Sequence, residues 1–325
     1  MSKHLDIIAT LGPTLLSEEE LVNIKKRGAT ILRINGAHSS PSNADRVIKR
    51  IRQYSIDIKI MIDLPGNKIR TTTLEIPIKL EKDAVFKLEA YQVNHPNFFE
   101  LVSPGTIITA HDSEYTFEVV SALKECLELK SHVNGMLKSN KGLHVVGNVQ
   151  DQFDFIFEKD QELIEVALEN MIDYLAASFV RTAADIREVK EIIGDRKIEL
   201  ISKIETKMAV EHVDEIFEEV NYILIDRGDL SSSVGLLDVV PAEEYIVSQA
   251  RKKKGIKVFL ATQFLTNMLH SPIPSIAEVF SLYKVVFEGV DGIQLSEETA
   301  IGEYGPECVD TIKAVFEKVK NNKES

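Results

Sequence analysis

The sequence predicts an α/β protein: a (β/α)₈ TIM barrel with a small β-rich domain inserted after the third strand. Short apolar runs alternate with amphipathic helical segments along the 325-residue chain. Eight strand–helix units of this kind can be counted, which is the number that closes such a barrel. Between about residues 71 and 151 the helical period disappears, and alternating apolar and polar residues with frequent turn residues take its place.

The first part of the barrel is expected to contain three strands, at residues 7–11, 30–34 and 58–64. The helix after the first strand opens with a capping box formed by Ser17 and Glu20 and ends at Gly28. A second helix is expected at about residues 43–54. We expect residues 1–70 and 152–325 to form the barrel domain, and residues 71–151 to form an inserted β-barrel-like lid domain.

The strand–helix rhythm returns after residue 155 and supplies five further strands. These strands are expected at residues 174–180, 199–203, 222–225, 258–262 and 292–295. Helices are expected at residues 161–171, 183–193, 208–220, 242–254, 276–287 and 307–320. A doubly wound sheet is the alternative fold. It fits less well, because charged motifs end nearly every strand, whereas such a sheet gathers its functional groups at one switch point.

Composition excludes several classes of protein. The net charge of −13 argues against nucleic acid or a membrane surface as a partner. The longest apolar runs are too short to span a bilayer, and the first strand begins too early for a signal peptide. The two cysteines, Cys126 and Cys308, have no metal-ligand spacing and indicate a reducing, cytoplasmic setting.

The most informative stretch is the strand that ends in Lys203-Ile204-Glu205. Side chains alternate along a strand, so Lys203 and Glu205 point to the same side. The next apolar run ends in Asp226-Arg227-Gly228-Asp229. Such strand ends suit a divalent metal together with an anionic, phosphorylated substrate. The alternative interpretation is structural: a Lys203–Glu205 ion pair at the barrel rim and an Arg227–Asp229 salt bridge in a loop.

Seven short motifs stand out along the chain: Ile8-Ala9-Thr10-Leu11-Gly12-Pro13, Arg33-Ile34-Asn35, Lys68-Ile69-Arg70-Thr71, Ser202-Lys203-Ile204-Glu205, Arg227-Gly228-Asp229-Leu230, Ala261-Thr262-Gln263 and Leu295-Ser296-Glu297-Glu298-Thr299-Ala300. They occur in the order seen in pyruvate kinases, which the chain resembles from end to end. The resemblance implies a barrel with an inserted β lid and an enzyme that moves a phosphoryl group between phosphoenolpyruvate and ADP. The sequence stops before the family's C-terminal regulatory domain, so we expect a monomer or homodimer without sugar-phosphate activation.

The resemblance also implies roles for particular residues. Glu205 and Asp229 would hold Mg²⁺ or Mn²⁺, because carboxylate oxygens suit a small, hard cation. Lys203, Arg33 and Arg70 would bind and neutralise the phosphoryl group during transfer. The backbone N–H groups of Gly228 and Asp229 would receive the substrate carboxylate, and Thr262 would lie beside the reacting carbon. The nucleotide phosphates would meet Asn35, His38, Arg70 and Lys141, and Asp112 and Lys141 would reach the site when the lid closes.

The chain departs from the family at several positions. Ala37 and Leu64 replace two oxygen ligands of the monovalent ion in potassium-dependent members, and Lys68 replaces an acidic residue. We therefore expect K⁺ not to be required, with the Lys68 ammonium supplying the charge. Glu297 and Ile301 replace a glycine and a lysine near the mouth of the site, which leaves the phosphoryl acceptor open.

Two other functions remain open. One is a metal-dependent lyase, aldolase or other phosphotransferase acting through a pyruvate enolate. The other is a non-catalytic relative that binds these ligands. Of the histidines, His111, His144 and His212 are interpreted as surface or packing residues, because no spacing among them indicates a metal site.

Overall fold

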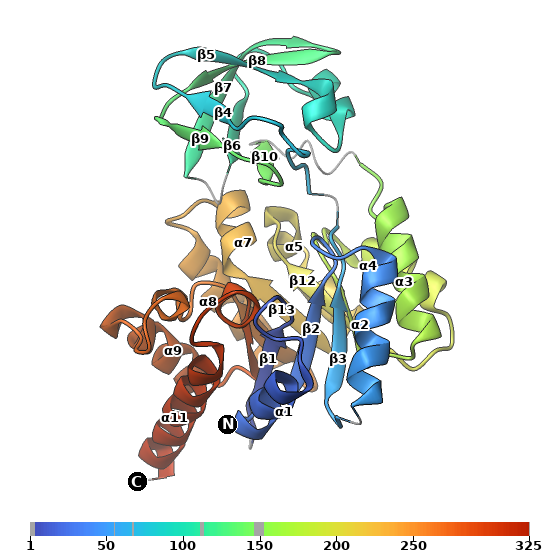
Figure 1. Ribbon diagram of the computed structural model, residues 1–325, viewed down its shortest axis with the longest axis vertical. Helices are drawn as coiled ribbons and strands as arrows, with labels where there is room; N and C mark the ends of the chain where they lie inside the picture. The colour runs from blue at the N-terminus through green and yellow to red at the C-terminus, as the bar shows by residue number, and fades with distance from the viewer. Residues whose placement is uncertain (1–3, 55, 67, 111–113, 146–152, 325) are drawn as a thin grey trace. The chain divides into compact units, whose positions relative to one another are not determined.

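The chain folds into two compact units, shown in the computed structural model in Figure 1. The structure describes residues 4–54, 56–66, 68–110, 114–145 and 153–324. The first unit comprises Met1–Gly66, Ile156–Arg227 and Val239–Ser325. The second comprises Asn67–Phe155 together with Gly228–Asp238. Among the described residues, no helix combines the length and the apolarity needed to cross a bilayer.

The first unit is built on a closed barrel of parallel strands, which confirms the predicted fold class. The strands follow one another around the barrel in the order β1-β15-β14-β13-β12-β11-β3-β2. Their bounds are β1 Asp6–Thr10, β2 Ile31–Asn35, β3 Lys59–Asp63, β11 Tyr174–Ala177, β12 Glu199–Ile204, β13 Tyr222–Asp226, β14 Lys257–Ala261 and β15 Gly292–Leu295.

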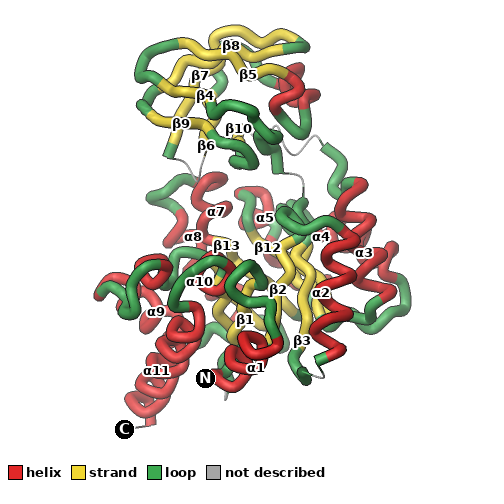
Figure 2. The backbone as a smooth tube through the Cα atoms, in the orientation of Figure 1, coloured by secondary structure: helices red, strands yellow, loops and turns green. Residues whose placement is uncertain are grey.

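Helices surround the strands, as Figure 2 shows for this unit. The first helix begins with the predicted capping box: Ser17 accepts from the Glu20 N–H, and Glu20 accepts from the Ser17 N–H. Gly28 ends that helix at a φ of 130°, a backbone conformation that favours glycine. The helices of this unit are α1 Glu18–Arg27, α2 Pro41–Gln53, α3 Glu158–Glu169, α4 Ala183–Ile193, α5 Lys207–Glu211, α6 Val213–Glu219, α8 Val239–Lys252, α9 Ile276–Glu288, α10 Glu297–Ala300 and α11 Gly305–Glu324. A further helix, α7 Arg227–Val234, begins at the last residue of the segment Ile156–Arg227 and otherwise belongs to the second unit.

The barrel interior changes from apolar to polar towards the carboxyl ends of the strands. Inward-facing side chains such as Ile31, Ile201 and Leu224 form a buried apolar cluster. Because side chains alternate, the residues two positions further along these strands also point inward. These residues and their counterparts on the other strands are mostly polar, and they form what we call the polar layer: Thr10, Arg33, Asp63, Ser178, Lys203, Asp226 and Gln294.

The second unit contains two antiparallel sheets around its own core. One sheet has the strand order β10-β6-β7-β8-β5 and the other pairs β4 with β9. Buried side chains including Leu88, Phe98, Phe117 and Leu129 form the core. The strands are β4 Ile78–Leu80, β5 Val85–Glu89, β6 Ile107–Ala110, β7 Tyr115–Leu123, β8 Cys126–Ser131, β9 Gly135–Leu137 and β10 Leu143–Val145, with 3₁₀ turns at Ala90–Gln92 and Pro96–Leu101.

One buried carboxylate holds the two places where the chain leaves the barrel and returns to it. Asp160 accepts the Gly66 N–H at 3.1 Å with one oxygen. Its other oxygen accepts the Phe157 N–H at 3.3 Å, at the start of α3. Gly66 has a φ of 59°, and a Cβ there would lie 2.9 Å from the Ser178 Cβ, so the position requires glycine.

Candidate active site

Within the polar layer, Arg33, Asp63 and Lys203 form the centre of a buried network of charges. The Arg33 guanidinium bonds the Asp63 carboxylate through Nε at 2.8 Å and Nη2 at 2.6 Å. The Lys203 ammonium lies 3.3 Å from Asp63 Oδ1 and 2.7 Å from Glu205 Oε1. Lys203 also donates to Ser178 Oγ at 3.0 Å. The predicted proximity of Lys203 and Glu205 on one side of β12 is therefore present.

These neighbours keep the network ionised. Burial alone would lower the pKa of Lys203, but the carboxylates of Asp63, Glu205 and Asp226 outweigh it and raise that pKa. Burial would likewise raise the pKa of Asp63, yet the charges of Lys203 and Arg33 outweigh it and hold that pKa below the ordinary 3.8. Cations that could meet a phosphoryl group are thus charged and fixed in place.

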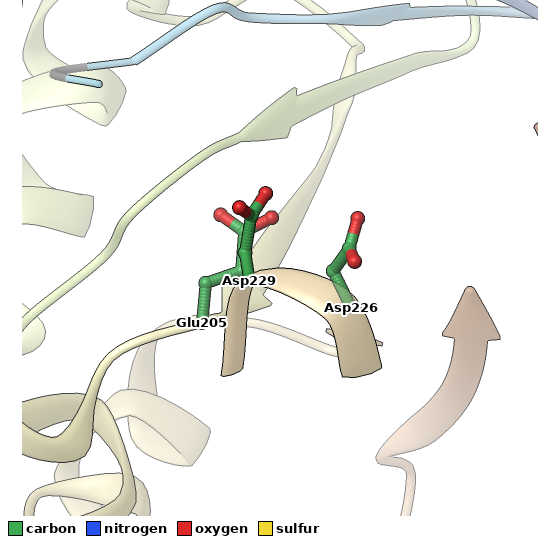
Figure 3. A group of neighbouring side chains, drawn as sticks. All are labelled: Glu205, Asp226 and Asp229. Carbon is green, nitrogen blue, oxygen red and sulfur yellow. The ribbon is translucent and has the colours of Figure 1, made fainter. Parts of the chain in front are cut away.

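Three carboxylates form a candidate metal-binding group: Glu205, Asp226 and Asp229. Each can offer one oxygen such that the three oxygens lie within 4.8 Å of one another. Figure 3 shows their side chains pointing the same way; Asp226 is the last residue of β13 and Asp229 lies in the first turn of α7. Glu205 is held by the Phe179 N–H, which donates to Oε2 at 2.7 Å from a residue whose φ is 55°.

The donor set fits a hard divalent cation. Carboxylate oxygens without histidine or cysteine suit Mg²⁺ or Mn²⁺ better than zinc or copper. The structure thus brings together the residues expected for the metal and adds Asp226, which the sequence reasoning did not assign to the site.

Strand β13 passes into α7 without an intervening loop, and Arg227 anchors this junction. Its guanidinium bonds the Glu243 carboxylate of α8 at 2.6 and 3.3 Å and Ser281 Oγ of α9 at 3.1 Å. The guanidinium carbon also lies 4.3 Å from the centroid of the Phe264 ring. The expected alternative, an Arg227–Asp229 salt bridge, is therefore wrong: Arg227 pairs with Glu243, and Asp229 pairs with Lys68.

Thr262 follows β14 in a strained backbone conformation. Its φ is 69°, and that of Gln263 is 55°. A positive φ at a β-branched residue is uncommon and costs energy, and such strain gathers at functional sites. The Thr262 hydroxyl lies 3.1 Å from Asp226 Oδ1 and 2.7 Å from the Ala261 carbonyl oxygen. Thr262 therefore belongs to the same group of polar residues as Lys203 and Asp226.

Within the second unit, Asp229 pairs with the Lys68 ammonium and has His144 nearby. His144 Nε2 lies 3.8 Å from Asp229 Oδ1, and its side chain is buried. Burial, followed by the charge of Lys68, lowers the pKa of His144 to about 4, so the ring is neutral near pH 7. His144 is therefore a packing residue and not a surface residue, and it packs beside a predicted metal ligand.

The residues expected to meet the nucleotide are divided between the units. In the barrel unit, Asn35 Oδ1 accepts the Ala37 N–H at 3.0 Å, and His38 is exposed. In the second unit, Arg70 donates through Nη1 to the Lys68 carbonyl oxygen at 3.3 Å, and Lys141 is partly exposed. Asp112 and His111 lie outside the described residues. A nucleotide-binding role for this set stays a prediction.

Sequence reasoning missed Asp63, Ser178 and Asp226 as members of the site. The sequence did carry a signal for the two aspartates. Asp63 and Asp226 are the last residues of β3 and β13, and Lys203 is the last residue but one of β12, so all three lie at the carboxyl ends of barrel strands. Their interaction depends on how neighbouring strands are aligned, for example Lys203 of β12 with Leu224 of β13. Spacing along one strand does not determine that register.

Comparison with known proteins agrees with this arrangement. The family model described as "Pyruvate kinase, barrel domain" matches residues 2–309. Curated relatives include pyruvate kinases from Borreliella burgdorferi at 30% identity, Geobacillus stearothermophilus at 31% and Thermoplasma acidophilum at 30%. The alignments cover 99%, 97% and 97% of this chain.

The chain spans 70% of the length of the first of these relatives, and only 57% and 58% of the other two. The match nevertheless includes nearly the whole of this chain, with the barrel strands that carry Arg33, Lys203, Glu205 and Asp226. On the extent of that match, the chain belongs to the pyruvate kinase family.

Proposed function

We propose that this protein catalyses metal-dependent phosphoryl transfer between phosphoenolpyruvate and ADP, giving pyruvate and ATP. The observation that carries the proposal is the arrangement of buried, charged Lys203 and Arg33 beside a group of carboxylates. Phosphoryl transfer depends mainly on positioning and on compensation of negative charge, and fixed cations next to a divalent-metal site supply both.

Arg33 and Lys203 would bind the transferring phosphoryl group. Among the described residues, the contacts of Arg33 to Asp63 and Thr10 use three of the five guanidinium N–H groups, and the other two would bind substrate oxygens. The Lys203 ammonium, held by Glu205 and Ser178, would offset charge on the phosphoryl group and on the enolate that forms. Because both cations are already ordered, little reorganisation is needed when the substrate arrives.

Glu205 and Asp229 would hold Mg²⁺ or Mn²⁺, with Asp226 as a third ligand. When bound, the cation supplies positive charge to the phosphoryl and enol oxygens. The backbone N–H groups of Gly228 and Asp229 lie in the first turn of α7, where an anion such as the substrate carboxylate is favoured. Thr262 would place a proton near the reacting carbon.

The phosphates of ADP would be met by Asn35, His38, Arg70 and Lys141. Lys68 would supply a fixed positive charge where potassium-dependent relatives bind a monovalent ion, so K⁺ would not be required. Leu64 is buried at this part of the chain and offers no oxygen to such an ion. We therefore propose a site that uses a divalent metal and a lysine ammonium in place of a divalent and a monovalent ion.

The test is an assay of pyruvate release from phosphoenolpyruvate with MgCl₂ and a panel of nucleoside diphosphates. We expect release that depends on both the metal and a nucleoside diphosphate, with ATP or its counterpart formed in equal amount. Glu205→Gln is expected to lower turnover by at least ~10²-fold, since loss of one precisely placed charge-stabilising group has that effect. Glu215→Gln, at an exposed position of α6, is the matched control and should leave turnover unchanged.

The outcomes separate the alternatives. Pyruvate release without any nucleoside diphosphate, or carbon–carbon cleavage of a 2-oxo acid, would favour a lyase or aldolase. Tight binding of Mn²⁺ and phosphoenolpyruvate without turnover would indicate a non-catalytic binding protein. Either result would overturn the proposed phosphoryl transfer.

A further inference from the structure

Gln294 is a buried amide in the middle of β15 that the proposed chemistry does not use. Its side chain is 1% exposed. Neither its Nε2 nor its Oε1 has a hydrogen-bond partner among the residues that the structure describes. An amide that is removed from water without a partner lowers stability, whereas a methionine of similar size would not. Gln294 is therefore suited to bind a group that is not part of the chain.

The side chain of Gln294 points into the barrel. Gly292, two residues earlier on β15, faces inward, since a Cβ there would lie 2.7 Å from Cδ1 of the core residue Phe259. Alternation places Gln294 on the same side. Its partner in the register is Ala261 of β14, which belongs to the interior cluster.

The neighbouring inward position across β14 carries Asp226. Ala261 is aligned with Gln294 on one side and with Asp226 on the other. Asp226 and Gln294 are therefore the inward-facing residues on either side of Ala261, whose side chain is a single methyl group. Thr262, the next residue, directs its hydroxyl to Asp226 Oδ1 at 3.1 Å. A carboxylate, a hydroxyl and an amide that has no hydrogen-bond partner among the described residues thus lie on neighbouring strands of the barrel.

We propose that Asp226, Thr262 and Gln294 form a subsite for a hydroxyl group on the methyl carbon of the 2-oxo acid, and on the corresponding carbon of its enol phosphate. The inference rests on the proposed function, in which Thr262 lies beside that carbon. A hydroxyl donates to the Asp226 carboxylate and accepts from the Gln294 amide. A bare methyl or methylene group satisfies neither. The preferred substrate class is therefore a 3-hydroxy-2-oxo acid and its enol phosphate.

The experiment measures the affinity of pyruvate and of hydroxypyruvate by calorimetry with saturating MnCl₂. The wild-type protein is expected to bind hydroxypyruvate about tenfold more tightly, the value of one charge-assisted hydrogen bond. Gln294→Met should reduce that preference to about twofold or less while pyruvate affinity stays within about twofold. Gln249→Met, on the surface of α8, is the matched control and should keep the wild-type preference.

Thermal unfolding of Gln294→Met is expected at or above the wild-type temperature, because an unpartnered amide has been removed; Gln294→Leu provides a second test of the same change. Equal affinity of the wild-type protein for the two acids would overturn the subsite and leave the proposed function standing. An unchanged preference in both Gln294 variants would also overturn it. If Mn²⁺ binds but neither acid does, the proposed function fails, and the subsite fails with it.

Discussion

Lys203 shows that the buried charges of this site compensate one another. Its ammonium is buried and shared among Asp63, Glu205 and Asp226, so its removal leaves several buried negative charges uncompensated. The same ammonium is proposed to meet the phosphoryl group. Structural and catalytic roles therefore coincide in one side chain, and an experiment on this residue must measure both.

We predict that Lys203→Met abolishes turnover and lowers the free energy of unfolding by about 3–5 kcal/mol in the absence of metal, the usual effect of breaking a buried ion pair. A divalent cation replaces part of the lost charge, so MnCl₂ should stabilise the variant more than the wild-type protein. Urea unfolding with and without MnCl₂ measures this difference. Unchanged turnover would refute the role assigned to Lys203.

Asp63 gives a prediction for the dependence of stability on pH. Its pKa in the folded protein lies below the ordinary 3.8. The stability that its charge contributes is thus fully present above about pH 3.8 and is lost as the pH falls through the lower folded-state pKa. Asp63→Asn should be strongly destabilised at pH 6.5, and its deficit relative to wild type should shrink below pH 3.8.

Urea unfolding at pH 6.5 and at lower pH measures this effect, and exposed Asp57→Asn is the control. A deficit for Asp63→Asn that stays constant down to pH 3 would contradict the assignment of a lowered pKa.

At the residue scale, the sequence was most informative where the site lies on one continuous stretch. Lys203 and Glu205 are two residues apart on one strand, and alternation alone places them together. Asp226 and Ser178 come from other strands, and their proximity to Lys203 follows from barrel closure. The sequence could not decide whether His144 is a surface or a packing residue, because its burial depends on how the second unit packs.

At the scale of elements, the junction of β13 and α7 determines where two of the three carboxylates lie. Asp226 is the last residue of the strand and Asp229 lies in the first turn of the helix. Arg227, between them, ties the junction to α8 through Glu243 and to α9 through Ser281. Arg227 therefore fixes the backbone that carries two carboxylates of the candidate metal-binding group, and is not itself one of the proposed ligands.

We predict that Glu243→Gln weakens Mn²⁺ binding by about tenfold and destabilises the protein, because the Arg227 charge loses its buried partner and the junction loosens. Ser281→Ala removes one hydrogen bond from the same guanidinium and should have a small effect on both. Calorimetric titration with MnCl₂ and urea unfolding measure the two quantities. Wild-type Mn²⁺ affinity in Glu243→Gln would show that Arg227 has no positioning role.

The elements themselves were largely predictable, because their signals are local. The capping box of Ser17 and Glu20, the glycine at position 28 and the alternation within the strands each depend on a few neighbouring residues. The helix expected at residues 208–220 is instead two helices, α5 and α6, with His212 outside helical geometry between them at a φ of −107° and a ψ of 16°. The apolar period continues through such a break, so the sequence pattern does not reveal it.

At the scale of the whole molecule, the barrel could be predicted because eight repeated units admit few closed arrangements. The division expected from the sequence, with residues 71–151 as a separate domain, stays a prediction, and nothing in the sequence indicated that Gly228–Asp238 would group with Asn67–Phe155 in one compact unit. That grouping joins segments that are distant in the chain. The expectation of a monomer or homodimer without sugar-phosphate activation stays a prediction.

The proposed replacement of a monovalent ion by Lys68 leads to a prediction for the protein as a whole. Turnover should differ by less than about twofold between KCl and tetramethylammonium chloride at equal ionic strength, because the Lys68 ammonium is part of the chain and does not depend on the salt. Steady-state assays of pyruvate release in the two salts measure this. Strong stimulation by KCl would contradict the role proposed for Lys68. The same comparison for Lys68→Met measures how far independence from K⁺ depends on the Lys68 ammonium.

The carboxylate of Asp160 has a practical consequence for protein engineering. Asp160 accepts the N–H of Gly66, just before the inserted segment, and the N–H of Phe157, just after it. Both ends of the segment are therefore held within the barrel unit. A shortened variant with residues 68–154 replaced by a brief glycine–serine bridge should therefore still close its eight strands. Comparing this shortened variant with the full chain would separate the contribution of the barrel residues Lys203, Glu205 and Asp226 from the contribution of the removed segment.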